Sequence, residues 1–523
     1  MAEFVGLHES FEFWARVRPE AEFAVHGDRV LTYREAAVRM DRMAASLAAA
    51  LAPGDRFALV AKNSIDVSIL YLAASKAGVV PVPLNYRLAP PEWAFILNDS
   101  GARLLLTDRE FVPGLSTITA EVKGLATTVA WSEAAEGGAW VPFEPWLGAS
   151  PADTDLSARC CDDALQAYTS GTTGRPKGAV LTQAALFAQM YQWRLGVPIG
   201  GDRRVLIVAP MYHVAGLLWV LHTVGNGASM YILSDFDPVE VVRVLDEERI
   251  ADTVLVPSMI QACLGVSGAE QRRYRDLRAI AYGASPIAEP TLRAAMGLFG
   301  CEFVQGFGMT ECPMLTVLTP ADHHRALDGA AHLLQSTGRA MPGCEVKVVD
   351  EEDNEVPAGT IGEICGRGPQ TMRGYWNLPE ATAEALRGGW MHTGDAGYLD
   401  DDGFLYIKDR LKDMIVSGAE NVYSIEVEDV LHRHPAVIEA AVFGIPDDTW
   451  GEAVHCIVVV AAEPSGGRER FAAELRDHCR EFIAGYKVPK RIEVRLEPLP
   501  KSGPGKILKR ALRDPFWSSR LVR

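Results

Sequence analysis

The sequence predicts an α/β protein with a large N-terminal domain of layered sheets and helices and a smaller α+β C-terminal domain. The chain of 523 residues is too long for one ordinary core, and its 48% hydrophobic content is typical of a well-packed globular protein. Strand-like apolar runs alternate with amphipathic helical runs over the first ~330 residues, which is typical of βαβ units and parallel sheets. After residue 423 a compact set of helices and strands predicts a separate domain.

The alternation in the N-terminal part is clearest in three pairs of segments, each a short apolar strand followed by a helix. The predicted strands are residues 56–61, 205–209 and 253–256, and the helices that follow them are residues 67–78, 215–224 and 258–264. Each pair has the length and order of a βα unit, so we expect these strands to belong to parallel sheets.

The pattern changes between Gly338 and Gly397, where short alternating segments replace the longer runs. Residues 345–349 and 361–365 alternate apolar and polar side chains and flank the turn sequences Asp353-Asn354 and Ala358-Gly359. Short strands joined by tight turns predict a small antiparallel, β-barrel-like unit.

Beyond Asp413 the sequence predicts a helix at residues 424–432, strands at 437–443 and 453–460, and a helix at 468–483. We therefore divide the chain into an N-terminal domain, residues 1–409, and a C-terminal domain, residues 410–523.

Charge, cysteines and hydropathy exclude several classes of protein. The formal net charge of −17 argues against a nucleic-acid partner, because a phosphate backbone would be repelled. No apolar run reaches the ~18 residues of a membrane span, and the N-terminus lacks the basic and apolar segments of a signal peptide. Nine scattered cysteines without a Cys-x-x-Cys pair predict neither a disulfide framework nor a structural metal, and favour a cytoplasmic location.

Residues 168–178, Tyr-Thr-Ser-Gly-Thr-Thr-Gly-Arg-Pro-Lys-Gly, form the most informative motif of the chain. Glycines let a backbone approach phosphate closely, hydroxyl and N–H groups donate hydrogen bonds to it, and Lys177 adds a cation. The spacing is not that of a P-loop, which needs Gly, four residues and then Gly-Lys-Ser/Thr. The motif predicts a triphosphate site of another architecture, with a surface loop as the alternative.

Five further motifs follow in series: residues 305–311 (Gln-Gly-Phe-Gly-Met-Thr-Glu), 392–395 (His-Thr-Gly-Asp), 409–413 (Asp-Arg-Leu-Lys-Asp), 417–421 (Ser-Gly-Ala-Glu-Asn) and 500–506 (Pro-Lys-Ser-Gly-Pro-Gly-Lys). In this order the chain resembles the adenylate-forming superfamily of acyl-CoA synthetases, peptide-synthetase adenylation domains and luciferases. The resemblance extends from Leu31 to Lys506 and implies two domains of which the C-terminal one is mobile.

The resemblance implies roles for individual residues. Lys506 matches the catalytic lysine that bridges the carboxylate and the α-phosphate, Glu311 the Mg²⁺ ligand, and Thr310 a phosphate contact. The implied ATP- and AMP-binding residues are Thr169, Ser170, Gly171, Thr172, Thr173, Lys177, Gly283, Ala284, Ser285, Gly306, Phe307, Gly308, Met309, Asp395 and Arg410. Asp395 matches the ribose-binding aspartate, and Phe307 replaces the commoner tyrosine, which keeps ring stacking but loses a hydroxyl.

Each of these residues also has a structural alternative. Lys506 would otherwise be a solvated surface lysine, Glu311 a helix N-terminal residue, Asp395 a turn residue and His213 a satisfied core histidine.

The C-terminal domain is implied to act twice. Lys412 matches the hinge about which related enzymes swing this domain between two half-reactions. The CoA channel is expected to include Ser417, Gly418, Ala419 and Trp450, where Ala419 replaces a common glycine. Trp450 is equally well explained as a core aromatic residue.

The predicted acyl pocket is apolar and contains no partner for an ammonium group. Its expected lining is His213, Trp219, Met259, Gly283, Phe307 and Met309, with His213 near the thioester-forming centre. Gly283, Gly306 and Gly308 are expected to leave the pocket floor open. Because no acidic residue lies between Val205 and Met230, we expect a carboxylate without an α-amine.

Together these features predict an ATP-dependent acyl-CoA ligase that uses ATP, Mg²⁺ and coenzyme A on an apolar medium-chain, alicyclic, aromatic or other bulky carboxylic acid. The alternatives are an enzyme of one half-reaction, which adenylates, loads a carrier-protein thiol, or thioesterifies a supplied acyl-AMP, and a nucleotide-binding regulatory protein. The sequence identifies no feature of a luciferase-type oxygenase, and it leaves open a homodimer and a carrier protein as the acceptor.

Overall fold

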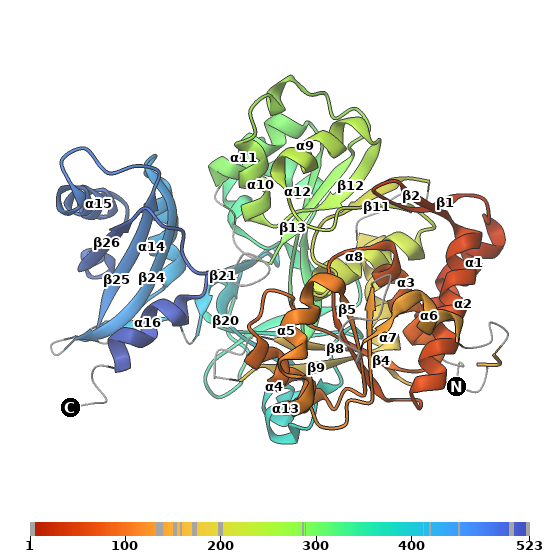
Figure 1. Ribbon diagram of the computed structural model, residues 1–523. Coiled ribbons are helices and arrows are strands. Elements are labelled where there is room, and N and C mark those ends of the chain that lie inside the picture. Colours follow the sequence, from red (N-terminus) through yellow and green to blue (C-terminus); the bar gives the residue numbers. More distant parts are fainter. Residues whose placement is uncertain are drawn as a thin grey trace.

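The computed structural model describes residues 6–131, 140–149, 154–156, 159–169, 175–196, 202–284, 287, 289–411, 413–417, 420–447, 450–501 and 507–518. Its elements form four sheets in a large N-terminal part and one sheet in a C-terminal part that stands to one side (Figure 1). This arrangement confirms the predicted α/β class with a separate C-terminal domain.

The largest sheet has nine strands in the order β16-β15-β14-β13-β12-β10-β11-β1-β2. The strands from β14 to β1 are mutually parallel, and β15, β16 and β2 join the edges in antiparallel pairing. Their bounds are β1 Glu22–His26, β2 Arg29–Thr32, β10 Arg204–Ile207, β11 Ser229–Ile232, β12 Ile250–Val254, β13 Ala279–Gly283, β14 Glu302–Met309, β15 Cys312–Leu318 and β16 Arg339–Ala340. The expected strands 205–209 and 253–256 are thus parallel neighbours.

Two smaller sheets complete the first part of the chain. A parallel sheet has the order β4-β3-β5-β6-β7, with bounds β3 Arg56–Val60, β4 Val80–Pro83, β5 Leu104–Asp108, β6 Thr127–Trp131 and β7 Val141–Pro142. An antiparallel sheet of β8 Asp163–Thr169, β9 Lys177–Thr182 and β19 Gly374–Tyr375 joins segments almost 200 residues apart.

Helices cover both faces of the nine-stranded sheet. The helices of the N-terminal part, some of which pack on the smaller sheets, are α1 Leu7–Val17, α2 Tyr33–Ala50, α3 Ile65–Ala77, α4 Pro90–Ser100, α5 Val112–Ser116, α6 Phe143–Gly148, α7 Gln183–Gly196, α8 Val214–Gly225, α9 Pro238–Glu247, α10 Pro257–Leu264, α11 Glu289–Phe299, α12 Pro320–Leu327 and α13 Pro379–Ala385. Side chains of α1–α3, α7 and α8 share one core with Val205 and Val304, whereas α9–α12 share another with Leu206 and Phe303. Because side chains alternate along a strand, these two cores lie on opposite faces of the sheet.

Local sequence explains where the helices begin. The Thr32 hydroxyl accepts a hydrogen bond from the Glu35 N–H at 3.2 Å, and Glu35 Oε2 accepts one from the Thr32 N–H at 2.8 Å, so a capping box starts α2. Ser64 caps α3, and Gly78, with φ of +65°, ends that helix in the left-handed conformation. Nearly every residue of α3 is buried, as expected for a helix between two sheets.

The segment between Gly338 and Gly397 contains antiparallel strands, as the sequence predicts. The sheet order is β17-β18-β20-β21, with bounds β17 Glu345–Val349, β18 Gly362–Arg367, β20 Met391–Leu399 and β21 Leu405–Arg410. In the part of the chain that the structure describes, its outer strands β17 and β21 do not pair, so the unit is an open sheet and the barrel-like closure is wrong.

The C-terminal part has its own sheet and core. Its strands are β22 Ile415–Ser417, β23 Glu420–Val422, β24 Val437–Asp447, β25 Gly451–Val460 and β26 Arg491–Arg495, and its helices are α14 Ser424–His432, α15 Arg468–Phe482 and α16 Lys509–Ser518. Helices α14 and α15 pack on one face of the β24–β25 pair and α16 on the other. The chain passes from one sheet to the other between Arg410 and Ile415, and the exact boundary at residue 409 stays a prediction.

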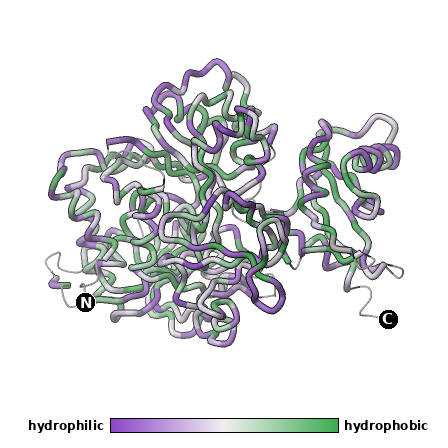
Figure 2. The backbone as a smooth tube through the Cα atoms, turned by 180° about the vertical axis from the view of Figure 1, so that it is seen from behind, coloured by the Kyte–Doolittle hydropathy of each residue, from purple (hydrophilic) through white to green (hydrophobic). Residues whose placement is uncertain are grey.

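Hydrophobic segments follow the sheets, and hydrophilic segments follow the outer helices and loops (Figure 2). None of the helices in the described ranges is long and apolar enough to cross a membrane.

Candidate active site

The predicted phosphate loop connects β8 and β9, which form a hairpin. Thr169 and Lys177 are directly opposite each other at the base of this hairpin. The Lys177 ammonium lies 4.3 Å from the ring centre of Tyr375, on the neighbouring strand β19. The hairpin therefore presents one cation beside the loop, held over an aromatic ring.

Glu311 lies next to this hairpin although it comes from another sheet. With Thr310 it forms the turn between β14 and β15, so the alternative of a helix N-terminus is wrong. Glu311 is only 5% exposed, and its Oε1 accepts a hydrogen bond from the Tyr375 hydroxyl at 2.8 Å. Burial, together with the neighbouring Glu311 carboxylate, raises the pKa of Tyr375, so this hydroxyl stays a donor.

Asp395 and Arg410 are opposite each other on β20 and β21, and their side chains form an ion pair with Nε and Oδ1 3.1 Å apart. Asp395 is buried inside a strand rather than in a turn, so the turn alternative is wrong. The carboxylate and the guanidinium, both predicted to contact ribose or phosphate, thus lie together.

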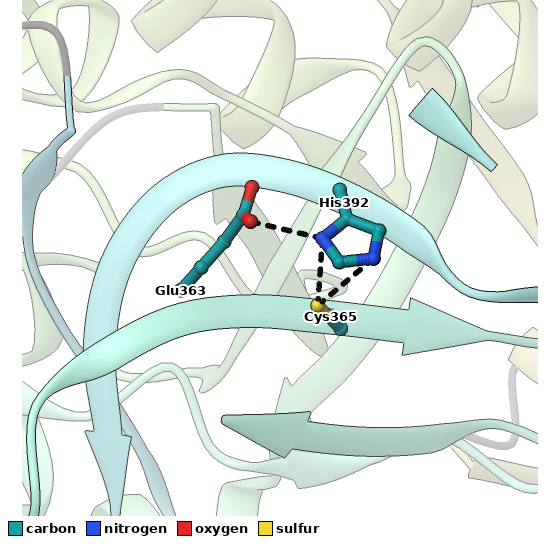
Figure 3. Close-up of side chains that lie close together, drawn as sticks. All are labelled: Glu363, Cys365 and His392. Atoms are coloured by element: carbon teal, nitrogen blue, oxygen red, sulfur yellow. Dashed lines mark hydrogen bonds and ion pairs between the residues drawn. The ribbon is translucent and has the colours of Figure 1, made fainter. Parts of the chain in front are cut away.

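The half-buried Glu363 and the buried Cys365 and His392 form a cluster on β18 and β20 (Figure 3), and Glu363 is opposite Ala396, the neighbour of Asp395. Glu363 Oε2 is 2.9 Å from both His392 Nδ1 and the Arg387 guanidinium, and its Oε1 accepts the Gly394 N–H at 3.1 Å. His392 Nδ1 also lies 3.3 Å from the Cys365 sulfur, and burial raises the pKa of that thiol to about 12.

Glutamate, cysteine and histidine are residue types that ligate zinc. Here, however, Glu363 is already neutralised by Arg387, whose guanidinium would repel a second cation. We interpret the cluster as a support that fixes Gly394, at φ +70°, and so orients Asp395.

The glycines of the predicted nucleotide-binding segments let neighbouring strands pack closely, which is not the role expected from the sequence. Gly283 and Gly306 are paired on β13 and β14, where a Cβ on Gly283 would overlap the Gly306 carbonyl oxygen. A Cβ on Gly306 would meet the Met314 side chain, and one on Gly308 the Met314 backbone nitrogen. The expectation of an open pocket floor is wrong, because these glycines allow close packing of strands. Ala284, which follows Gly283, has φ of +65°.

The residues predicted to line one acyl pocket fall on two faces of the sheet. Trp219, Phe307 and Met309 pack with the core of α7 and α8. Met259, on α10, packs with the opposite core and lines a separate cavity of about 250 Å³. His213 is half-buried at the N-terminus of α8, where its Nδ1 accepts the Ala215 N–H at 3.3 Å. This hydrogen bond makes His213 the N-cap of α8 and fixes the orientation of its ring. Its catalytic role stays a prediction.

The predicted CoA residues that the structure describes lie close together in the C-terminal part. Ser417 is buried and pairs with Gly451, the neighbour of Trp450. Trp450 is 49% exposed, so the alternative of a core aromatic residue is wrong. The Lys490 ammonium lies 4.4 Å from its ring centre.

Several predicted residues lie outside the described residues: Ser170, Gly171, Thr172, Thr173, Ser285, Lys412, Gly418, Ala419 and Lys506. Conversely, sequence reasoning missed Tyr375 and Glu363. Glu363 could have been found in the sequence, because it is an acidic residue within an alternating, strand-like run. Tyr375 could not, because its place near Glu311 depends on the pairing of β19 with β9.

Comparison with known proteins agrees with these features. A model of the AMP-binding enzyme family matches residues 11–376, and a model of the AMP-binding enzyme C-terminal domain matches residues 426–506. The chain belongs to the AMP-binding enzyme family. The resemblance predicted from the motifs is confirmed, and so, at the level of this family, is the prediction of an AMP-forming acid–thiol ligase.

Relatives in the AMP-binding family match almost end to end. A fatty acid–acyl-carrier-protein ligase, ScoC of Streptomyces coeruleorubidus, is 36% identical over 522 residues, covering 98% of this chain and 96% of its own. A feruloyl-CoA synthase of an Amycolatopsis species is 37% identical over 508 residues, covering 96% and 97%. Among solved structures, the anthranilate CoA ligase AuaEII in complex with anthranoyl-AMP has a TM-score of 0.89 at 26% identity, covering 99% of each chain.

Proposed function

We propose that this protein is an ATP-dependent acyl-CoA ligase that works by two half-reactions. A carboxylate oxygen attacks the α-phosphorus of ATP and the bond to pyrophosphate breaks, which gives acyl-AMP. The thiolate of coenzyme A then attacks the acyl carbon, AMP leaves, and the thiol proton passes to solvent.

One observation above all supports the first half-reaction. Tyr375 contacts both Lys177, through its ring, and Glu311, through its hydroxyl, and so joins three segments far apart in the sequence. A cation beside a loop of glycines and hydroxyls, next to a buried carboxylate, is the combination that triphosphate binding requires.

Glu311 fits the role of a magnesium ligand, because a carboxylate together with phosphate oxygens is the usual environment of this ion. Bound Mg²⁺ would neutralise charge on the phosphates. Tyr375 would keep Glu311 in place through its hydrogen bond, and Lys177 would attract the polyphosphate. Asp395 would accept hydrogen bonds from the ribose hydroxyls, with Arg410 beside it.

Lys506 is proposed to bridge the carboxylate and the α-phosphate during adenylation. A compact ammonium on a flexible stem suits a contact that is made in one half-reaction and released in the next. The C-terminal domain would then turn about Lys412 and bring Ser417 and Trp450 to the thiol substrate.

The acceptor and the acid belong to the same proposal. Coenzyme A is favoured by the feruloyl-CoA synthase and the anthranilate CoA ligase, and a carrier-protein thiol is favoured by ScoC, so both acceptors need testing. The apolar surroundings of Trp219, Phe307 and Met309 favour an apolar acid without an α-amine.

The test is pyrophosphate release from MgATP with a panel of carboxylic acids, each with coenzyme A, with a phosphopantetheinylated carrier protein, and without a thiol. We expect one group of acids to drive release and the Lys506→Ala variant to lose it, while that variant still converts supplied acyl-AMP to thioester. Thioester formation from acyl-AMP without acid-driven release in the unaltered protein would identify an enzyme of one half-reaction and refute the role of Lys506.

A further inference from the structure

Three aromatic side chains form a box between α7 and α8. The ring centres of Trp193 and Trp219 are 5.6 Å apart at an interplanar angle of 84°. His222 lies 5.8 Å from the first ring and 5.6 Å from the second. The two contacts of Trp193 are edge-to-face and the contact between Trp219 and His222 is tilted at 32°, so the three rings form a rigid apolar surface on which a further ring packs well.

The box adjoins the proposed reaction centre. Trp193 Cζ3 lies 4.0 Å from where a Cβ of Gly306 would be, and Trp193, Trp219 and Met309 belong to one core. Gly306 lies within strand β14, which ends at Met309, directly before the turn of Thr310 and Glu311. An acid whose carboxylate reacts near that turn therefore extends its other end along β14 towards the box.

The box and its surroundings contain hydrogen-bonding groups that have no partner in the part of the chain that the structure describes. Trp193 and Trp219, 7% and 6% exposed, have no acceptor for their indole N–H groups among the described residues. Gln189, one turn before Trp193 on α7 and 3% exposed, has no described partner for either amide atom. Buried polar groups are nearly always paired, so three such side chains on two packed helices call for a bound group that supplies partners.

The two indole N–H groups determine which hydrogen-bonding atoms the bound group must have. An indole N–H is only a donor, so the two tryptophans require acceptors, whereas Gln189 can give and take a hydrogen bond. Hydroxyl, methoxyl or carbonyl oxygens on a ring supply these, and a linear alkyl chain does not.

The surroundings also exclude a second charge on the substrate. Segment 205–230 contains no aspartate, glutamate, lysine or arginine, and the sole charged side chain of α7, Arg194, is exposed. Burial lowers the pKa of His222 to about 3, so this ring is neutral near pH 7. An ammonium would be buried here without a carboxylate on these segments, and a second carboxylate would have only the exposed Arg194 of α7 as a counter-charge.

We propose that the substrate is an aryl carboxylic acid, neutral apart from its reacting carboxylate, whose ring carries oxygen substituents that accept hydrogen bonds from Trp193 and Trp219. The inference rests on the proposed ligase function and narrows its substrate class. It separates this chain from ligases of linear fatty acids, of amino acids and of dicarboxylates.

The experiment compares pairs of acids that differ by one oxygen: 4-hydroxycinnamate, 4-methoxycinnamate and cinnamate, then 3-hydroxybenzoate and benzoate, with octanoate and decanoate as alkyl acids. We expect the preferred oxygen-substituted acid to have at least ~10-fold higher kcat/KM for pyrophosphate release than its parent acid, because a site built around hydrogen bonds rejects the analogue that lacks them.

Three variants remove the polar groups one at a time: Trp219→Phe, Trp193→Phe and Gln189→Met. The Trp→Phe changes also remove part of the buried indole ring, so they need a control that loses the same volume elsewhere. We expect at least one Trp→Phe variant to lower the oxygenated-to-parent ratio by ~10-fold. The matched control is Trp131→Phe, whose N–H is also buried without a described partner but lies on β6, where its ring contacts Phe143. This control should keep the ratio of the unaltered protein.

The outcomes separate the two proposals. If no acid releases pyrophosphate, the ligase function fails and this inference with it. If alkyl or parent aryl acids react as well as oxygenated ones, or if both Trp→Phe variants keep the ratio, the ligase function stands, the N–H groups bind water, and the inference is overturned.

Discussion

Tyr375 positions the Glu311 carboxylate, although the two residues are far apart in the sequence. Its hydroxyl donates to Glu311 Oε1 at 2.8 Å, and its ring lies under the Lys177 ammonium. Residues that hold a metal ligand typically contribute ~10–100-fold to metal affinity, so we expect Tyr375→Phe to raise the apparent KM for MgATP about 10-fold. Steady-state pyrophosphate release at varied MgATP measures this change.

The control for this variant is Tyr274→Phe, which removes a buried hydroxyl that donates to the Ala269 carbonyl in the other core. It should leave the KM for MgATP unchanged. Equal effects of the two variants, or none from Tyr375→Phe, would show that Tyr375 does not position Glu311.

At this scale, motifs predict residues whose chemistry is local. Thr169 with Lys177 and Asp395 with Arg410 are adjacent pairs in the structure, and all four residues were singled out from their motifs, although the pairing was not predicted and their binding roles stay predictions. Tyr375 could not be predicted, because its role arises from the pairing of β19 with β9. The glycines of β13 and β14 were misinterpreted for a related reason, since sequence shows a missing side chain but not the Met314 side chain or the carbonyl that fills its place.

At the scale of elements, α16 is held on the C-terminal sheet through a buried histidine. His455 on β25 packs between Phe443 and Phe516, with ring centres 5.1 and 4.9 Å away, and neither ring nitrogen has a partner among the described residues. Burial lowers its pKa to about 4, opposed by Glu493 and assisted by Arg491 and Arg495 on β26.

This pKa makes the C-terminal core sensitive to acid. Because the unfolded chain binds a proton near pH 6.5 and the folded chain only near pH 4, His455 costs no stability above pH 6.5 and progressively more as the pH falls towards 4. Between pH 7.5 and pH 5 the loss is about 2 kcal/mol.

We therefore expect His455→Phe, which keeps a ring between the two phenylalanines, to reduce the fall in melting temperature between pH 7.5 and pH 5. Scanning calorimetry at both values measures it. An unchanged fall in the variant would mean that other groups cause the acid sensitivity.

The elements themselves were largely predictable where their patterns are long and local. The predicted helix 424–432 is α14, and the predicted strand 453–460 lies within β25. The turn at Thr310 and Glu311 was missed because a single acid after Gly-Met-Thr has the same local pattern at a hairpin as at a helix start. Likewise, the alternation that reveals strands β17 and β18 does not show whether their sheet closes.

At the scale of the whole molecule, the C-terminal part stands beside the N-terminal part and joins it through the segment after β21 (Figure 1). A buried network lies at this junction. Asp409 accepts the Ser424 N–H, and Lys509 Nζ lies 2.5 Å from the Ser424 hydroxyl and 2.7 Å from Glu428. The network links the last strand of one part to α14 and α16 of the other, where the chain passes between the two parts. The hinge residue implied by the resemblance, Lys412, lies outside the described residues, and its role stays a prediction.

The last prediction concerns which half-reaction depends on Trp450 of the C-terminal part. Trp450 is 49% exposed on the C-terminal part, next to Gly451, which pairs with Ser417, and Lys490 lies over its ring. If this part serves adenylation through Lys506 and thioester formation through Trp450, then Trp450→Ala should damage only the second step. Aromatic stacking on a base contributes ~1–3 kcal/mol, so we expect the KM for coenzyme A to rise about 10-fold. Pyrophosphate release with hydroxylamine as the acceptor should stay unchanged.

The matched control is Phe482→Ala, another aromatic residue of this part that is 49% exposed, which should affect neither step. Equal losses in both steps, or the same loss from Phe482→Ala, would show that Trp450 maintains the domain and does not bind coenzyme A.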